Sequence, residues 1–229
     1  MEQISMKIIA RIKSDFPEKF GIPRQSGLVE KLRSTIIFEP EFRNAEALRG
    51  LEDFSHLWLI WQFSKTVRED WTPTVRPPRL GGNTRMGVFA TRSPFRPNAI
   101  GLSSVRILGI EHTDQYGTVI HVGGADLMDG TPIFDIKPYV PYSDTHLDAI
   151  GGFTDNAGDF ILDVVFPSEL LQKVPLDKRE ALCGVLSHDP RPSYQSDPER
   201  IYGLSFAGYN INFKVAENTL TVCEITKIP

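Results

Sequence analysis

The sequence predicts a mainly β fold, with a closed or partly open β-barrel over residues 1–165 and a small α+β domain over residues 166–229. Short runs of branched and aromatic residues recur along the first part, and turns containing Gly and Pro separate them. The composition changes at Phe166–Pro167, where helical spacing begins. Many short strands with few helical periods favour a barrel or a closed sheet. The second part is too thin to be stable alone, so we expect it to dock on the first.

The expected strands of the first domain are short and closely spaced. Their branched and apolar residues place them at residues 4–13, 34–38, 55–63, 102–112, 118–124 and 133–137. The segment Ser55–Phe63 is apolar on both faces, which is typical of a central strand in a closed sheet.

Two of the connections between these strands have a recognisable pattern. A brief helix is expected over residues 39–51, because Pro40 lies near its start and Gly50 near its end. Residues 126–132 form a tight turn, in which Asp129–Gly130 is a strong hairpin signal.

The C-terminal domain combines helical spacing with alternation. Residues 168–187 have the spacing of a helix that Pro175 splits in two, and Ser168 is a candidate N-terminal cap. Residues 201–228 alternate as a hairpin around Glu217–Asn218. This pattern predicts a small α+β unit.

Composition indicates a soluble protein of the cytoplasm. A hydrophobic fraction of 41% supports a real core, and the net charge of −4 argues against a nonspecific nucleic-acid coat. No apolar run approaches the length of a membrane span, and the first residues lack a secretory core. Cys183 and Cys223 have no motif spacing, which fits a reducing compartment.

The charge distribution is uneven along the chain. Between Trp71 and Ile110 there are six arginines and no Asp, Glu or Lys, so the rest of the chain carries about −10. The six are Arg76, Arg79, Arg85, Arg92, Arg96 and Arg106. A cluster of guanidinium groups suits a planar anion such as a carboxylate, a phosphate or a nucleic-acid backbone. The alternative is that these arginines pair with the protein's own acids.

Within this segment, residues 92–98 (Arg-Ser-Pro-Phe-Arg-Pro-Asn) form a stiff loop. Pro94 and Pro97 fix the backbone and push the residues before them into extended conformations. The loop therefore presents Arg92, Arg96 and Asn98 with little conformational entropy left to lose on binding.

The segment that follows has the opposite charge. Residues 111–163 contain ten acidic residues and one basic residue, Lys137. We expect the basic and acidic segments to face each other across a cleft or a subunit interface.

Two other polar positions each allow two interpretations. Gln25 and Ser26 lie beside Gly27, which lets a ligand approach the backbone, but the same residues also fit a surface turn. His56, at the entry of a strand, is by itself more typical of a structural histidine than of a catalyst.

Several common sites have no motif in the sequence. There is no glycine-rich nucleotide loop after a strand, no zinc spacing and no serine-hydrolase elbow. Asp144, His146 and Asp148 would share one face of a strand and could form a metal-assisted hydrolase site, although a solvated edge fits them better. From the residues alone, we expect a site for a small ligand with an anionic end.

Three blocks of the sequence resemble one known family. Residues 87–98 (Gly-Val-Phe-Ala-Thr-Arg-Ser-Pro-Phe-Arg-Pro-Asn), residues 129–139 and residues 188–195 are similar, in this order, to blocks of the YaeB/TsaA family, now called TrmO. The resemblance implies a homodimeric methyltransferase that uses S-adenosylmethionine and a β-barrel rather than a Rossmann domain. It implies that the substrate is the N6 of threonylcarbamoyladenosine, next to the anticodon of tRNA. The C-terminal domain resembles the bacterial two-domain form and is a possible tRNA contact.

The resemblance also implies where the cofactor binds. Arg92 would hold the methionine carboxylate, oxygens of the 126–129 turn would face the sulfonium, and Leu102 and Leu127 would line an adenine slot. The cofactor residues implied are Gln25, Ser26, Gly27, His56, Leu57, Arg92, Leu102, Asp126, Leu127, Met128, Asp129, Gly130 and Thr131. No metal is expected.

Methyl transfer to an acylated nitrogen requires that a proton leaves. A general base would help by roughly 10²- to 10⁴-fold, and the candidates are Asp126, Asp135 and Tyr142. The threonyl carboxylate of the substrate offers a second anion, for which Arg96 or Arg191 is a natural clamp. The substrate-binding residues implied are Arg96, Asn98, Lys137, Arg191 and Tyr194. A noncatalytic RNA- or nucleotide-binding barrel is the alternative function, although the segment has few interleaved aromatic residues.

Overall fold

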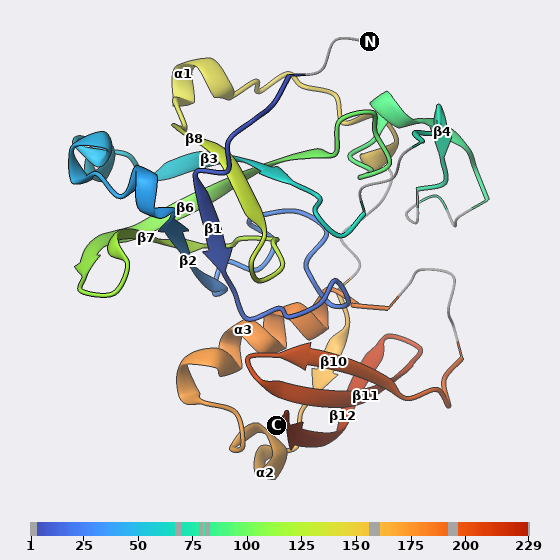
Figure 1. The fold of residues 1–229 in the computed structure, drawn as a ribbon. Helices are drawn as coiled ribbons and strands as arrows, with labels where there is room; N and C mark the ends of the chain where they lie inside the picture. Colours follow the sequence, from blue (N-terminus) through green and yellow to red (C-terminus); the bar gives the residue numbers. More distant parts are fainter. Residues whose placement is uncertain are drawn as a thin grey trace.

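The structure is a computed structural model that describes residues 4–66, 70–77, 80, 83–155, 161–191 and 197–228. The chain forms two bodies, a closed ring of strands above and a smaller C-terminal sheet with its helices below (Figure 1). This agrees with the expectation of a mainly β fold. Within the described residues, no helix is both long enough and apolar enough to cross a lipid bilayer.

Six strands make up the ring, and each pairs antiparallel with its neighbours in the order β1-β2-β7-β6-β3-β8, with β8 returning to β1. Their bounds are β1 Ala10–Lys13, β2 Arg33–Phe38, β3 His56–Gln62, β6 Ile100–Thr113, β7 Gly117–Gly123 and β8 Pro132–Pro138. The alternation of side chains puts one face of each strand into a common apolar core, which includes Ile36, Leu57, Leu59 and Ile133. All six strands coincide with expected ones, although β1 is shorter at its start and β6 is longer at both ends.

The expected helix over residues 39–51 is wrong. Three short 3₁₀ helices occupy this region, at Pro40–Phe42, Ala45–Leu48 and Leu51–Asp53. The side-chain oxygen of Asn44 accepts a hydrogen bond from the backbone of Glu46, which caps the start of the second 3₁₀ helix. Gly50, with φ +85°, precedes the third. These two local preferences interrupt a continuous helix.

The Asp129–Gly130 turn is present, but it does not form a hairpin. Gly130 has φ +74°, as this turn requires. The flanking strands β7 and β8 pair with β2 and β6 and with β1 and β3 respectively, so they are not neighbours in the ring. The turn therefore connects two strands that are not neighbours in the ring.

The C-terminal body has its own core. The helix splits at Pro175 as expected, into α2 (Ser168–Leu171) and α3 (Leu176–Ser187), but Ser168 is the first helical residue and makes no capping hydrogen bond. The sheet contains β9 (Asp163–Val165), β10 (Tyr202–Phe206), β11 (Tyr209–Ala216) and β12 (Thr219–Lys227). The expected hairpin around Glu217–Asn218 is present between β11 and β12.

Helix α3 lies between the C-terminal sheet and the ring (Figure 1). Phe16, Val29 and Leu32, which come from the N-terminal half of the chain, belong to the C-terminal core. The ring of Phe16 lies 5.2 Å from that of Phe206 in an edge-on arrangement. The two bodies are thus joined by shared apolar packing. The division at residue 166 stays a prediction, and β9 already belongs to the C-terminal sheet.

The remaining elements are short. They are the two-stranded pair β4 (Thr74–Val75) and β5 (Met86–Gly87), helix α1 (Pro141–Asp144) and the 3₁₀ helices Val88–Ala90 and Gly152–Thr154. The pair β4–β5 and the helix after it carry the chain into the Arg92–Asn98 loop, which leads directly to the start of β6 at the ring.

Candidate functional site

A cavity of about 480 Å³ opens at the end of the ring where β3 finishes and β6 begins. Four stretches line it: residues 19–25, residues 61–66, residues 91–102 and residues 126–131. The volume falls within the range of about 300–1,000 Å³ that is typical of small-molecule sites. Arg92 and Arg96 from the basic segment face this cavity together with Asp126 from the acidic one. The two segments therefore meet at this cavity through Arg92, Arg96 and Asp126, while the other described acids of residues 111–163 do not line it.

The indole of Trp61 forms one wall, and a glycine makes room for it. Trp61 and Gly101 are partners in the β3–β6 pairing. A Cβ atom built on Gly101 would lie 2.3 Å from the Trp61 ring, so a larger residue would displace the indole. The close approach of the Trp61 indole therefore requires a glycine at position 101.

Asp126 is a half-buried carboxylate at the wall of the cavity. The hydroxyl of Ser103 donates to its Oδ1 at 2.7 Å, and the indole nitrogen of Trp61 donates to the Ser103 oxygen at 3.0 Å. Burial raises the pKa of Asp126 above its ordinary value of 3.8, while the hydrogen bond from Ser103 and the charge of Arg92 oppose this rise. A half-buried carboxylate with a raised pKa beside a cavity is typical of a functional site.

Arg92 and Gln25 meet at the cavity from loops that are far apart in the sequence. A guanidinium nitrogen of Arg92 donates to the side-chain oxygen of Gln25. Both residues line the cavity, and Arg92 is exposed enough to bind an anion there. This contact holds the cation opposite the Asp126 wall.

Arg96 supports the shape of the loop that contains it. Its Nη1 donates to the carbonyl of Thr91 at 2.7 Å, and its guanidinium lies 5.9 Å from the centre of the Phe89 ring. Arg96 also lines the cavity. The stiffness predicted from Pro94 and Pro97 is thus reinforced by a side chain of the same loop.

The basic segment forms no internal ion pair among the described residues. Within those residues, Arg76, Arg85, Arg92, Arg96 and Arg106 have no carboxylate within 4.0 Å, and Arg79 lies outside them. The interpretation that these arginines are neutralised by the protein's own acids is therefore not supported for the five. Their charge remains available to a ligand or a partner.

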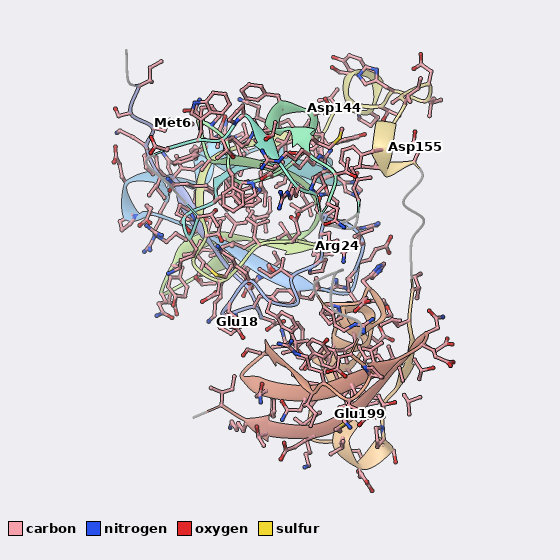
Figure 2. All side chains as sticks on the ribbon, turned by 90° about the vertical axis from the view of Figure 1, so that its right-hand side faces the viewer. Met6, Glu18, Arg24, Asp144, Asp155 and Glu199 are labelled. Carbon is pink, nitrogen blue, oxygen red and sulfur yellow. The ribbon has the colours of Figure 1, made fainter. Side chains whose placement is uncertain are left out.

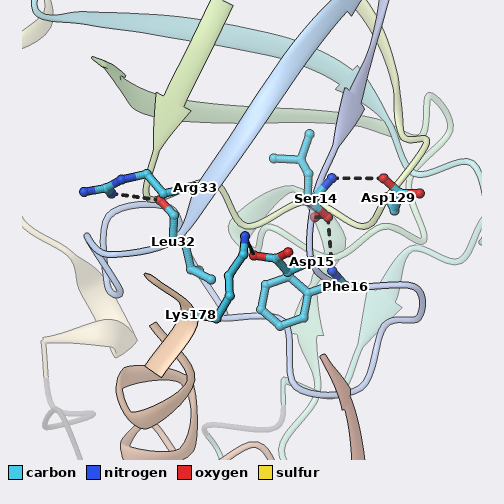
Figure 3. Close-up of polar contacts among 8 residues, drawn as sticks. Ser14, Asp15, Phe16, Leu32, Arg33, Asp129 and Lys178 are labelled. Atoms are coloured by element: carbon cyan, nitrogen blue, oxygen red, sulfur yellow. Dashed lines mark hydrogen bonds and ion pairs between the residues drawn. The ribbon is translucent and has the colours of Figure 1, made fainter. Parts of the chain in front are cut away.

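The turn over residues 126–131 is fixed from behind by the chain that leaves β1. The backbone nitrogen of Ser14 donates to Oδ1 of Asp129 at 2.9 Å, and its hydroxyl donates to the carbonyl of Leu127 at 2.9 Å (Figure 3). The backbone nitrogen of Asp129 donates to Phe16, whose ring belongs to the C-terminal core. Asp129 and Gly130 thus shape the turn and do not line the cavity.

The cofactor residues implied by the resemblance divide into three groups. Seven line the cavity: Gln25, Arg92, Leu102, Asp126, Leu127, Met128 and Thr131. Ser26, Gly27, Asp129 and Gly130 shape its walls: the backbone of Ser26 hydrogen-bonds Asp126, and Gly27, with φ +83°, donates to Gly124. His56 and Leu57 lie at the opposite end of β3 from Trp61, and Leu57 is fully buried in the ring core.

Of the three candidate bases, Asp126 alone lines the cavity. The carboxylate of Asp135 is on β8 and pairs with Lys137 at 2.9 Å. Tyr142 is on α1 and is 93% exposed. The structure therefore does not bring the three together.

The substrate-binding candidates are also dispersed. Arg96 lines the cavity, whereas Asn98 is exposed beside it and Lys137 is held by Asp135 on β8. The guanidinium of Arg191 donates two hydrogen bonds to the carboxylate of Asp189, at 2.8 and 2.9 Å, and this interaction raises the pKa of Arg191. Tyr194 lies outside the described residues.

The acidic residues at 144–148 do not lie on a strand, so that expectation is wrong. Asp144 ends α1 and accepts hydrogen bonds from the Trp58 indole at 2.9 Å and from the backbone of Val140 at 2.8 Å, which lower its pKa. His146 and Asp148 follow it in an exposed segment. Asp144 itself lies far from the C-terminal body (Figure 2). Pro141 starts a helical turn here, which takes the three side chains off a common face.

Trp61 and Ser103 are site residues that sequence reasoning missed. Both lie on strands that the apolar pattern predicted, and neither belongs to a block of polar residues. The signal that could have found Ser103 is a serine at a core-facing position of β6, between the buried Gly101 and Val105. A buried hydroxyl requires a partner, and here the partner is Asp126.

Comparisons with known proteins identify the family. Residues 11–145 match the model of the tRNA-methyltransferase O N-terminal domain, and residues 161–228 match the TrmO C-terminal domain. The chain is 40% identical over 226 residues to the tRNA (adenine(37)-N6)-methyltransferase of Escherichia coli strain K12, with 95% of both chains covered. A putative S-adenosylmethionine-dependent methyltransferase, RcsF, of Pseudomonas aeruginosa is 43% identical over 209 residues, which cover 87% of each chain.

A solved structure shows the same fold. The crystal structure of TrmO from P. aeruginosa superposes with a TM-score of 0.80 at 34% identity and covers 99% of this chain and 98% of that one. The chain therefore belongs to the TrmO family.

Proposed function

We propose that this protein transfers a methyl group from S-adenosylmethionine to the N6 of threonylcarbamoyladenosine next to the anticodon of tRNA. The names of the relatives support tRNA adenine methylation with this donor. The single observation that carries the proposal is the cavity that a half-buried carboxylate, Asp126, lines together with a guanidinium, Arg92, whose charge acts on it. Such a cavity provides a cation for the amino-acid carboxylate of the donor and a base for the acceptor nitrogen.

The cavity residues fit the chemical parts of the donor. Arg92 supplies a bidentate partner for a carboxylate, with Gln25 holding it in place. Leu102 and Leu127 offer apolar surface for a flat base, and carbonyl oxygens of the 126–131 turn suit a sulfonium. S-adenosylmethionine supplies an activated methyl group, and alignment by the protein accounts for much of the rate.

Asp126 is the group proposed to take the proton from the acceptor nitrogen. It lines the cavity, its pKa is raised, and Ser103 orients it through a hydrogen bond of 2.7 Å. A raised pKa makes a carboxylate a stronger base, which the poorly basic acylated nitrogen requires. Arg96, at the same cavity, is proposed to receive the threonyl carboxylate of the substrate.

The other parts of the proposal concern assembly and location. We propose that the ring of antiparallel strands acts as a β-barrel and replaces the parallel nucleotide-binding sheet of Rossmann enzymes. We propose a homodimer that acts in the cytoplasm, with residues 1–165 as the catalytic domain and residues 166–229 contacting tRNA. No metal is required for the reaction proposed.

Mass analysis of tRNA nucleosides tests this function directly. Cells that lack the gene should contain threonylcarbamoyladenosine without the N6 methyl group. Complementation with the wild-type gene should restore the methylated nucleoside, and Asp126→Asn should not. Identical nucleoside profiles in all strains would contradict the proposal, and tight tRNA binding without methylation would favour the noncatalytic RNA-binding barrel.

A further inference from the structure

A second cavity, of about 440 Å³, lies on the outer face of β1, β2 and β7, beside α3. Lys13, Thr35 and His121 form a row across the three strands, because Lys13 pairs with Thr35 and Thr35 with His121. Arg33 at the start of β2 and Lys178 from α3 line the same cavity. The fold thus gathers three permanent cations and a histidine on one face.

Carboxylates neutralise only part of this charge. Lys178 pairs with Asp15 at 2.7 Å, with both side chains largely buried (Figure 3). His121 lies between Glu111 at 2.8 Å and the hydroxyl of Thr35 at 3.1 Å. Of the carboxylates in the described ranges, none lies within 4.0 Å of the Lys13 ammonium or the Arg33 guanidinium.

The surroundings of Arg33 include the carboxylate of Glu180, which another cation already pairs. Its Nη1 donates to the backbone carbonyls of Glu30 at 2.8 Å and Leu32 at 3.2 Å, which fixes the guanidinium in place. Glu180 on α3 is paired with Lys31 at 2.9 Å. Its carboxyl pKa is lowered mainly by Lys31 and to a smaller extent by Arg33. Because Lys31 and Glu180 cancel, the three cations Lys13, Arg33 and Lys178 exceed the two acids Asp15 and Glu111 by one charge. The cavity therefore carries an excess of positive charge, on a chain whose net charge is −4.

The second cavity is adjacent to the first. Ser14 lines the second cavity and donates its hydroxyl to the carbonyl of Leu127, which lines the first. A substrate with one group in the first cavity and a chain of anions running from it could reach the second. Among such substrates, a polynucleotide has regularly spaced phosphates, which suit a row of cations and hydroxyl groups.

We propose that this cavity binds a backbone phosphate of the RNA substrate, with Lys13 and Arg33 as its cationic ligands. The proposal rests on the proposed function, because it takes tRNA as the substrate. It assigns to the junction of the two bodies a part in tRNA binding that is separate from the methyl-transfer cavity.

Filter binding of tRNA to the full-length protein at a series of KCl concentrations tests the proposal. The test variant is Lys13→Gln/Arg33→Gln, and the matched control is Lys7→Gln/Arg49→Gln, which removes one Lys and one Arg that pair with Glu41 and Glu46 elsewhere on the N-terminal body. The test variant should bind tRNA roughly ten-fold more weakly near 0.1 M salt, and the slope of log affinity against log salt should fall by about 1 to 2. The control should change far less, and S-adenosylmethionine affinity should stay as in the wild type.

The outcomes separate this proposal from the function. Wild-type tRNA affinity and slope in the test variant would overturn the phosphate site, whatever the methylation assay shows. Absence of methyl transfer with a reduced slope would overturn the function and leave the site. If Arg33→Gln prevents folding, Lys13→Gln alone should still lower the slope by about 1. Binding of inorganic phosphate that Lys13→Gln weakens, without any change in tRNA binding, would assign the cavity to a free anion and overturn the RNA proposal.

Discussion

The two cavities on either side of the Ser14–Leu127 hydrogen bond differ in how they manage charge. In the first, the acid Asp126 is half-buried, accepts a hydrogen bond from Ser103 and interacts with the charge of Arg92. In the second, the cations Lys13 and Arg33 have no carboxylate partner among the described residues. The first is suited to a small ligand whose groups must be placed individually, and the second to an anion that is bound by charge.

This difference predicts that the first cavity determines donor binding and turnover, and that the second determines the salt dependence of tRNA binding. A charge that contacts a ligand inside a cavity is screened less by salt than a cation that remains exposed to solvent. Changes at the first cavity should therefore alter donor affinity or turnover at any ionic strength. Changes at the second should alter the salt dependence of tRNA binding. Each prediction below tests one side of this contrast.

The largest expected effect is that of Asp126→Asn, which removes the proposed base and keeps the shape. Turnover at saturating donor should fall by about 10²- to 10⁴-fold, while S-adenosylmethionine affinity changes only a few-fold. Single-turnover methyl transfer and equilibrium dialysis measure the two quantities. Asp135→Asn, on the outside of β8, is the matched control. Loss of donor affinity with unchanged turnover would show that Asp126 binds the donor and is not the base.

Arg92→Ala should weaken donor binding by about 10- to 100-fold, because it removes a charge-assisted hydrogen bond to the donor carboxylate. Arg85→Ala removes the same charge from the same basic segment, but Arg85 does not line the cavity. Equilibrium dialysis should therefore separate the two variants. Equal effects of both would show that the segment acts through its overall charge, and the contrast between the cavities would fail.

Ser103→Ala should have a smaller effect and a distinct signature. The hydrogen bond from Ser103 lowers the pKa of Asp126, so its removal should raise that pKa further. The acidic limb of the turnover–pH profile, where Asp126 becomes protonated, should move to higher pH, and turnover above the limb should fall several-fold. Ser103→Thr keeps a hydroxyl and should restore the wild-type limb. An unmoved limb in Ser103→Ala would separate Ser103 from the titration of Asp126.

The smallest expected effect concerns stability. The folded pKa of Asp126 lies above its unfolded value, so the folded chain keeps this proton at pH values where the unfolded chain has lost it. The contribution of Asp126 to stability is therefore present below about pH 3.8 and is lost as pH rises through the folded pKa. Relative to the wild type, Asp126→Asn should gain stability with rising pH in denaturant titrations. A difference that does not vary with pH would contradict a half-buried, ionised Asp126.

Local sequence patterns predict the strands of this fold well, because each strand has its own run of branched or alternating residues. They do not predict which strands become neighbours when the ring closes. The Asp129–Gly130 turn has the chemistry of a hairpin, but β7 and β8 find other partners in the ring. Residues 39–51 have start and stop signals of one helix, but Asn44 caps a separate 3₁₀ helix in the middle of this range.

In the site too, local sequence reveals contiguous residues but not those that strand pairing brings together. The basic loop and the acidic turn are visible in the sequence because their residues are contiguous, and Arg92 and Asp126 do line one cavity. Ser103 and Trp61 contribute through the β3–β6 register, which no contiguous motif encodes. His56 is on the correct strand, but it lies at the far end of β3 from the cavity.

A crystal structure of the protein with S-adenosylmethionine tests the central claim most directly. The account predicts the donor in the cavity between the Arg92 loop and the 126–131 turn, with its carboxylate on Arg92 and its methyl group directed to a space beside Asp126. A donor bound elsewhere, such as in the Lys13–Arg33 cavity, or one whose methyl group is remote from Asp126, would contradict it.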